Sequence, residues 1–451
     1  MEAPAVARRG PGDPQGLRPR PADADHERLP LTAEPSRLDR RVGLLDAVVV
    51  GLGAMIGAGV FAAVGPAAAA AGGGLLVGLV VAAAVAYCNA ASSAQLAAVY
   101  PQAGGTYVYG RERLGPFWGH LAGWGFVVGK TASCAAMALT FGAYAAPQWR
   151  RPLALAAVAV LAAVNYMGIR KTTVVTRAIV AVVLAILAAV VAGTLGNGVS
   201  TANLGPITGH GWRAILESAG LLFFAFAGYA RLATLGEEVA DPSRTIPRAI
   251  PLALGLTLFV YAAVLGSALL AAGPALLAEA RAPLAAALDT GPFAGLAPVV
   301  RVGATVACLG VLLSLLAGVS RTIFAMAANG EMPGWLGAVH PSHRVPHRAE
   351  IAVAALVVLV VLAADVRGAI GVSSFTVLAY YAIANAAAWT LPAHQRRWPR
   401  FVAGAGLVGC VILAFTLPTT SILFGSAVLT VGAARWWLRS RRPRRGLAHR
   451  P

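Results

Sequence analysis

Apolar stretches of about twenty residues recur along the whole chain and constrain its fold more than any other feature. A helix rises about 1.5 Å per residue, so such a stretch spans the roughly 30 Å of hydrocarbon in a bilayer. Hydrophobic residues make up 58% of the chain and charged residues 12%, a composition foreign to soluble domains. We therefore expect an all-α integral membrane protein. The sequence predicts twelve spans, at residues 43–66, 72–98, 117–146, 152–168, 176–195, 212–235, 248–273, 294–328, 349–364, 368–391, 399–416 and 418–438.

The basic residues are unevenly distributed between the loops, within a net charge of +18. If successive loops alternate sides, most Lys and Arg residues fall on the side of the two termini. The opposite side carries only Arg150, Arg151, Arg213, Arg281 and Arg367. This asymmetry predicts a multi-pass protein of the inner (cytoplasmic) membrane with both termini in the cytoplasm, and it argues against a nucleic-acid partner.

The sequence predicts a tail outside the membrane at each end of the chain. Residues 1–42 are rich in Pro, Arg and acidic residues, which predicts a disordered cytoplasmic tail. Residues 439–451 form a basic tail that we expect to lie against anionic lipid headgroups of the bilayer.

The sequence offers no motif of an enzyme, a metal site or a cofactor site. The four cysteines lie in apolar stretches, where they behave as small hydrophobic residues. His340, His343 and His347 have the spacing of metal ligands, but they lie in a proline-containing loop that we expect to hold no metal. We expect neither catalysis nor a cofactor.

The first predicted span contains the run GLGAMIGAGVF, residues 51–61, with four glycines. One interpretation is close helix packing, because Gly53 and Gly57 are four residues apart. The sixth span has a comparable interruption at Gly228. Five spans separate the two, and an odd number inverts the topology of a repeat. Paired interruptions in inverted halves point to the binding site of a secondary transporter.

An unwound helix exposes backbone groups that bind charge. The second half of the first span would begin near Gly59 with free N–H groups, which favour a carboxylate. The carbonyls near Met55 and Ile56, and near Phe224 and Ala227 in the sixth span, would accept hydrogen bonds from an ammonium. A zwitterionic amino acid carries both groups.

Several motifs resemble the amino acid–polyamine–organocation transporter family. GLGAMIGAGVF is similar to its first-helix signature, FFAFAGY…GEEVADPSRTIPRAI to its sixth helix, and LLAGVSRTIFAMAANGEMPGWLGAVHP to its eighth. The resemblance covers about residues 40–440 in the right order. It implies a LeuT-type fold with discontinuous helices 1 and 6, built as a five-plus-five inverted repeat plus two C-terminal helices. The first repeat would be residues 43–195, the second 212–391, and the extra helices 398–438.

The resemblance also implies roles for residues at the two breaks. Ala58 and Gly59 would offer N–H groups to the substrate carboxylate, and Phe224 would form an aromatic lid. Two positions depart from the family pattern: Ala230 stands where an acidic residue is common, and Val183 where many proton-coupled members have lysine. The predicted substrate-binding residues are Met55, Ile56, Gly57, Ala58, Gly59, Phe224, Ala225, Ala227, Gly228 and Arg231.

Charged residues near the membrane interior have two interpretations each. Lys130 either supplies the coupling charge that the helix-5 position lacks, or serves as a structural lysine paired with backbone carbonyls. Arg231 either faces the cavity and disfavours cationic substrates, or points elsewhere. Glu237 and Glu238 either form an inner gate with arginines such as Arg111 and Arg113, or belong to a solvated turn.

We therefore expect a secondary active transporter of amino acids that favours neutral side chains and works by proton coupling or exchange. A cationic amino acid or polyamine antiporter is the alternative within the family. A transport-inactive amino acid sensor of the same fold is the alternative outside transport.

Overall fold

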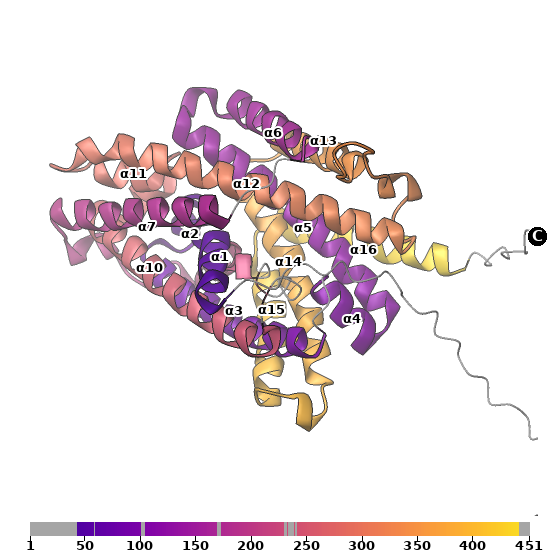
Figure 1. The fold of residues 1–451 in the computed structure, drawn as a ribbon. Helices are drawn as coiled ribbons and strands as arrows, with labels where there is room; N and C mark the ends of the chain where they lie inside the picture. The colour runs from indigo at the N-terminus through magenta and orange to yellow at the C-terminus, as the bar shows by residue number, and fades with distance from the viewer. Residues whose placement is uncertain are drawn as a thin grey trace, which may run out of the picture. The chain divides into compact units, whose positions relative to one another are not determined.

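The computed structural model describes residues 43–57, 59–100, 104–168, 173–229, 232, 239 and 241–441, apart from the side chains of residues 173–175, 242 and 243. Helices joined by short connections make up most of these ranges (Figure 1). The helices are α1 (Leu44–Ile56), α2 (Gly59–Ala71), α3 (Leu75–Val99), α4 (Thr106–Leu114), α5 (Pro116–Ala145), α6 (Arg150–Tyr166), α7 (Thr173–Gly196), α8 (Gly211–Phe226), α10 (Pro242–Glu279), α11 (Pro283–Leu288), α12 (Ala297–Ala328), α13 (His347–Ala363), α14 (Val366–Trp389), α15 (Arg400–Thr416) and α16 (Thr419–Ser440).

Each predicted apolar stretch coincides with one or two of these helices. Within the described ranges, seven segments are long and apolar enough to cross a membrane. The shorter α6, α8 and α13 have 16 or 17 residues. The helices also expose large apolar side chains, such as Phe259, Phe401 and Phe424, each about 70% exposed. Long apolar helices with exposed apolar faces indicate an integral membrane protein.

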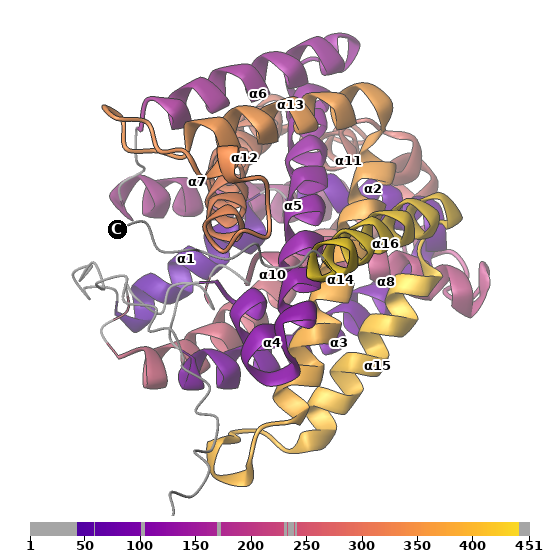
Figure 2. The ribbon, with the colours of Figure 1, turned by 90° about the vertical axis from the view of Figure 1, so that its right-hand side faces the viewer.

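Helix α5 runs through the bundle and contacts helices on several sides (Figures 1 and 2). It contacts α4, α6, α12 and α14, while α6 and α13 lie side by side along one flank. Small residues permit this close packing: a methyl group added at Gly129 would lie 2.9 Å from the Val377 side chain of α14. The packing of α5 places its residue Lys130 in the protein interior.

The α10 segment bends at Gly273, whose φ of 74° is a conformation that only glycine adopts without strain. The predicted span 248–273 ends at this residue. The long part of α10, before the bend, contacts α1, α2 and α3 and brings Tyr261 into the core.

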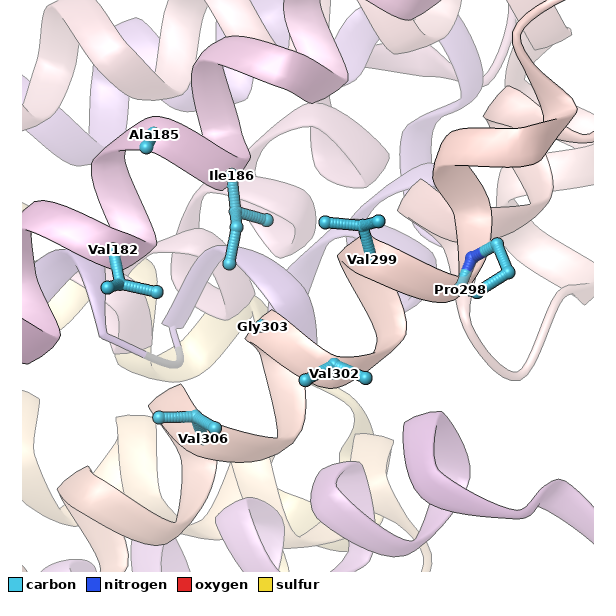
Figure 3. A pocket seen from close by; sticks show the side chains of 8 residues that line it. All are labelled: Val182, Ala185, Ile186, Pro298, Val299, Val302, Gly303 and Val306. Atoms are coloured by element: carbon cyan, nitrogen blue, oxygen red, sulfur yellow. The ribbon is translucent and has the colours of Figure 1, made fainter.

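An open groove of about 520 Å³ lies between α7 and α12 (Figure 3). Aliphatic side chains and one proline line it, so it offers no hydrogen-bonding side chain to a zwitterion. Val302 is 63% exposed there. On helices of membrane-spanning length, such a surface suits lipid chains. The lining residues are Val182, Ala185, Ile186, Pro298, Val299, Val302, Gly303 and Val306.

Candidate functional site

The structure interrupts both spans that carry the glycine signals. Helix α1 ends at Ile56 and α2 begins at Gly59. Helix α8 ends at Phe226 and passes into a 3₁₀ turn, η4 (Ala227–Tyr229). Glycine supports the first break because each glycine in a helix interior costs about 1 kcal/mol relative to alanine.

The two interruptions contact one another. Gly228 of η4 packs on the backbone of α1: a methyl group added there would overlap the Ala54 carbonyl oxygen and lie 2.8 Å from the Met55 nitrogen. A methyl group added at Gly59 would lie 2.6 Å from the Ala225 Cα atom. Backbone therefore meets backbone at the junction, and glycine allows this approach on both sides.

Tyr261 of α10 ties the two breaks together. Its hydroxyl lies 2.7 Å from the Met55 carbonyl oxygen and 3.2 Å from the Ala225 carbonyl oxygen. The side chain is 1% exposed, and its ring packs edge-on against Phe226. The hydroxyl thus satisfies a backbone group that unwinding leaves without a helical partner.

We predict that Tyr261→Phe destabilises the folded protein by about 1–3 kcal/mol, because it leaves a buried carbonyl without a donor. Thermal unfolding of the detergent-solubilised protein measures this effect. Tyr87→Phe is the matched control, since Tyr87 of α3 is 43% exposed. Equal unfolding temperatures for the two variants would contradict the bridging role of Tyr261.

Lys130 reaches the second break from α5. Its Nζ atom lies 3.4 Å from the Ala227 carbonyl oxygen and 6.0 Å from the centroid of the Phe126 ring. The side chain is 7% exposed. Among the described residues, no acidic side chain lies within ion-pair distance of it. Lys130 therefore contributes a buried positive charge that a backbone carbonyl meets at the break.

Tyr381 of α14 approaches the same carbonyl. Its hydroxyl lies 3.5 Å from the Ala227 oxygen. Its ring stacks on Tyr229 of η4 at 5.0 Å and meets Phe223 edge-on at 5.8 Å. Tyrosines of α10 and α14 thus line the breaks, a feature that the sequence analysis missed because a tyrosine in an apolar stretch carries no positional signal.

The predicted substrate-binding residues that the structure describes lie at this junction, and all but the half-buried Gly228 are buried. Met55 and Ile56 are each 1% exposed, and Phe224 is 9% exposed. The Phe224 carbonyl accepts the Ala227 N–H as a helix cap, so a backbone donor occupies it. Ala58 and Arg231 lie outside the described residues.

Val183, at the position where related proton-coupled proteins carry lysine, faces the first break. It lines a small cavity of about 10 Å³ together with Ile56 and Gly57. This side of the break is apolar. Among the described residues, Lys130 of α5 brings a basic side chain to the second break.

A second polar cluster lies where α12 ends. The buried Glu331 carboxylate pairs with Arg111 of α4 and lies 3.2 Å from Nδ1 of His120 on α5. Arg435 of α16 donates to the Glu331 carbonyl oxygen. We call Arg111, His120, Glu331 and Arg435 the Glu331 cluster. It links four helices through one carboxyl-bearing residue.

The predicted partners of the inner gate are engaged elsewhere. Arg111 pairs with Glu331, and Arg113 donates to the side chain and carbonyl of Thr390. Glu237 and Glu238 lie outside the described residues, so their pairing remains a prediction. The sequence analysis did not single out Glu331, which stands in a short loop that looks solvated.

The histidines of the loop between α12 and α13 pack around Tyr166 rather than converging on a metal geometry. The ring centroids of His340 and His343 lie 5.3 and 5.9 Å from that of Tyr166. Desolvation and the neighbouring His343 and His347 lower the pKa of His340, whose Nδ1 accepts two backbone N–H bonds. In the described ranges, no three His, Cys, Asp or Glu residues are placed to hold a metal ion.

Comparison of the sequence with known proteins identifies the family. A sequence profile described as amino acid permease matches residues 42–445. An uncharacterized transporter of Mycobacterium tuberculosis is 59% identical over 408 residues, which cover 90% of this chain and 92% of that protein. The branched-chain amino acid permease BcaP of Bacillus subtilis is 25% identical over 345 residues, covering 71% of this chain and 74% of the permease. Cationic amino acid transporter 4 of Homo sapiens is 27% identical over 376 residues, which cover 77% of this chain and 59% of that transporter.

The profile match includes both helix breaks and Lys130. The relatives are named as transporters, and the chain has several helices of membrane-spanning length. The chain belongs to the amino acid permease family, within the amino acid–polyamine–organocation transporters.

Proposed function

We propose that this protein is a secondary active transporter that moves amino acids with neutral side chains across the cytoplasmic membrane by alternating access. In this proposal the chain crosses the membrane twelve times, as two inverted repeats of five helices plus two C-terminal helices. Both termini lie in the cytoplasm. Helices 1 and 6 of the repeats correspond to α1–α2 and to α8 with η4.

The observation that carries the proposal is the contact between the two interrupted helices. Gly59 lies against Ala225, and Gly228 lies against Ala54 and Met55. Irregular backbone at membrane depth is tolerated where it is buried in protein or lines a cavity. Paired breaks that meet are the expected binding site of a transporter with an inverted repeat.

The breaks suit the two charged groups of an amino acid. The N-terminus of α2, at Gly59, would attract the α-carboxylate through free N–H groups and the positive end of the helix dipole. The carbonyls of Met55 and Ala227 would accept the α-amine. Lys130 would act as the coupling group, because an ionisable side chain at membrane depth is functional by default.

The surroundings of Lys130 favour neutral over cationic substrates. No described acidic side chain lies within ion-pair distance of Lys130, so none would compensate a second positive charge on the substrate beside the amine-binding carbonyl. Named relatives include a branched-chain amino acid permease and a cationic amino acid transporter, so both classes occur among related proteins. The local charge supports the neutral class.

Counterflow tests the proposal. Liposomes containing purified protein are loaded with unlabelled L-alanine, L-serine, L-leucine or L-phenylalanine, and entry of the same labelled amino acid is followed. We expect transient accumulation above equilibrium with at least one of the four. Accumulation only with lysine, arginine or a polyamine would favour the cationic alternative. Binding without exchange, by protein that elutes as a single folded species, would favour the sensor.

A further inference from the structure

The carbonyl oxygen of Ala227 already lies beside the amino group of a lysine in this structure. The Lys130 ammonium lies 3.4 Å from it, and the Tyr381 hydroxyl lies 3.5 Å from the same oxygen. A carbonyl oxygen has two lone pairs, so these two donors use both. A substrate amine that binds this oxygen must displace one of them.

Lys130 is the donor that an arriving ammonium expels. Two like charges at neighbouring hydrogen-bond positions repel strongly where water is scarce, and Lys130 is 7% exposed. Tyr381 carries no charge, and its ring is held by the stack on Tyr229 and the edge contact with Phe223. The substrate ammonium therefore repels the Lys130 ammonium but not the Tyr381 hydroxyl.

The surroundings offer little to a displaced ammonium. Among the described residues, the titratable groups around it are Cys134 of α5, Tyr381 of α14 and, stacked on Tyr381, Tyr229 of η4. The other helices packed on α5, namely α2, α4, α6, α12, α13 and α16, bring no described acidic side chain within ion-pair distance of Lys130. Burying a charge without a partner costs far more than burying a neutral amine. If Lys130 loses a proton, it becomes neutral and no longer repels the substrate ammonium.

We infer that a substrate amine and a proton on Lys130 exclude one another at the Ala227 carbonyl, so that the protein exchanges an amino acid for a proton. This inference rests on the proposed transport function. In the binding step one N–H bond of Lys130 breaks, and its electron pair stays on the nitrogen as the neutral amine. The proton passes to water on the side to which the site is open, and the substrate ammonium takes the hydrogen bond to Ala227.

Exclusion at one carbonyl sets the direction of coupling. Only two forms cross the membrane: the empty protein with Lys130 protonated, and the loaded protein with Lys130 neutral. A proton moving inward then drives an amino acid outward, so a cell with an acidic exterior would export the substrate. A symporter would bind proton and amino acid together, and acid would strengthen binding.

The first experiment measures proton release on binding. Purified protein in weakly buffered detergent solution is mixed with the neutral amino acid that gives the strongest counterflow, and the pH change is read with an indicator dye. We expect release of about one proton per amino acid bound and an apparent Kd that weakens about tenfold for each unit of acidification while Lys130 is protonated. A pH-independent Kd, or proton uptake, overturns the inference.

Two variants identify the group that releases the proton. Lys130→Met has no proton to exchange, so we expect its Kd to lose the pH dependence and its binding to release no proton. Lys130→Arg keeps a fixed charge, so we expect weaker binding at every pH, also without release. Arg301→Met removes a half-buried basic side chain from α12. We expect this variant to keep the wild-type dependence of the apparent Kd on pH. Proton release that persists in both Lys130 variants overturns the assignment.

Liposomes then separate this inference from the proposed function. With equal pH on both sides, counterflow tests transport alone. With the interior loaded with the amino acid and the exterior made acidic, we expect faster efflux and alkalinisation of the exterior. Counterflow without such a proton movement overturns antiport and leaves transport standing. Absence of counterflow in folded wild-type protein removes the proposed function itself.

Discussion

Gly228→Val is expected to reduce counterflow to the background of empty liposomes. A side chain at this position would overlap the Ala54 carbonyl oxygen and crowd the Met55 nitrogen, and both are backbone atoms that cannot rotate away. Overpacking a tight interior costs about 1–3 kcal/mol, and more where backbone must shift. Because the strain falls on the contact between the two helix breaks, it displaces the groups that would bind both ends of the substrate.

Gly318→Ala is the matched control for this change. Gly318 lies in α12, and nothing stands within 4 Å of where its methyl group would be. In a helix interior, alanine is more favourable than glycine by about 1 kcal/mol. We expect Gly318→Ala to keep the wild-type unfolding temperature or raise it, with normal counterflow. Wild-type counterflow in Gly228→Val would show that the contact between the breaks is dispensable for transport.

The helices themselves were predictable from hydropathy. The predicted span 117–146 corresponds to α5 (Pro116–Ala145), and 176–195 to α7 (Thr173–Gly196). Burial of twenty apolar residues in lipid dominates the energetics of each helix, so its limits follow from where polar residues and prolines begin. The inner end of α1 was predictable for another reason, because glycine at four positions in one helix is costly unless the helix is broken. The inner end of α8 was predictable from Gly228, five spans later.

The partners of the breaks were not predictable from the sequence. Tyr261 follows Met55 by about two hundred residues, and Tyr381 follows Ala227 by about one hundred and fifty, yet both hydroxyls reach backbone carbonyls. A tyrosine that faces lipid and one that bridges two helices look alike in an apolar stretch. Lys130 was different, because a charge at membrane depth is conspicuous on its own.

The Glu331 cluster shows how a short loop can mislead. Glu331 follows the end of α12 and resembles a solvated turn residue, yet its side chain is 3% exposed. Its carboxylate meets Arg111 and His120, while Arg435 binds its carbonyl. The expected partners of Arg111 were Glu237 and Glu238, which lie outside the described residues, so that pairing stays a prediction. Tertiary packing of α4, α5, α12 and α16 brings Glu331 to Arg111 and His120.

Glu331→Ala is expected to lower the free energy of unfolding by roughly 2–4 kcal/mol. Removing one partner of a buried ion pair leaves the other charge uncompensated, which costs about 3–5 kcal/mol. We reduce this figure because the Arg111 side chain is 31% exposed and water can partly solvate it. Chemical or thermal unfolding in detergent measures the loss.

The Arg367–Glu217 pair supplies the comparison that isolates burial as the cause. Its nitrogen–oxygen distance is 2.7 Å, but its side chains are 42% and 20% exposed. An exposed pair contributes up to about 1 kcal/mol, so Glu217→Ala should change stability little. If Glu331→Ala costs no more than Glu217→Ala, the cluster does not hold the end of α12. If the double variant Glu331→Ala with Arg111→Met recovers stability, the cost lies in the orphaned guanidinium, as a buried pair requires.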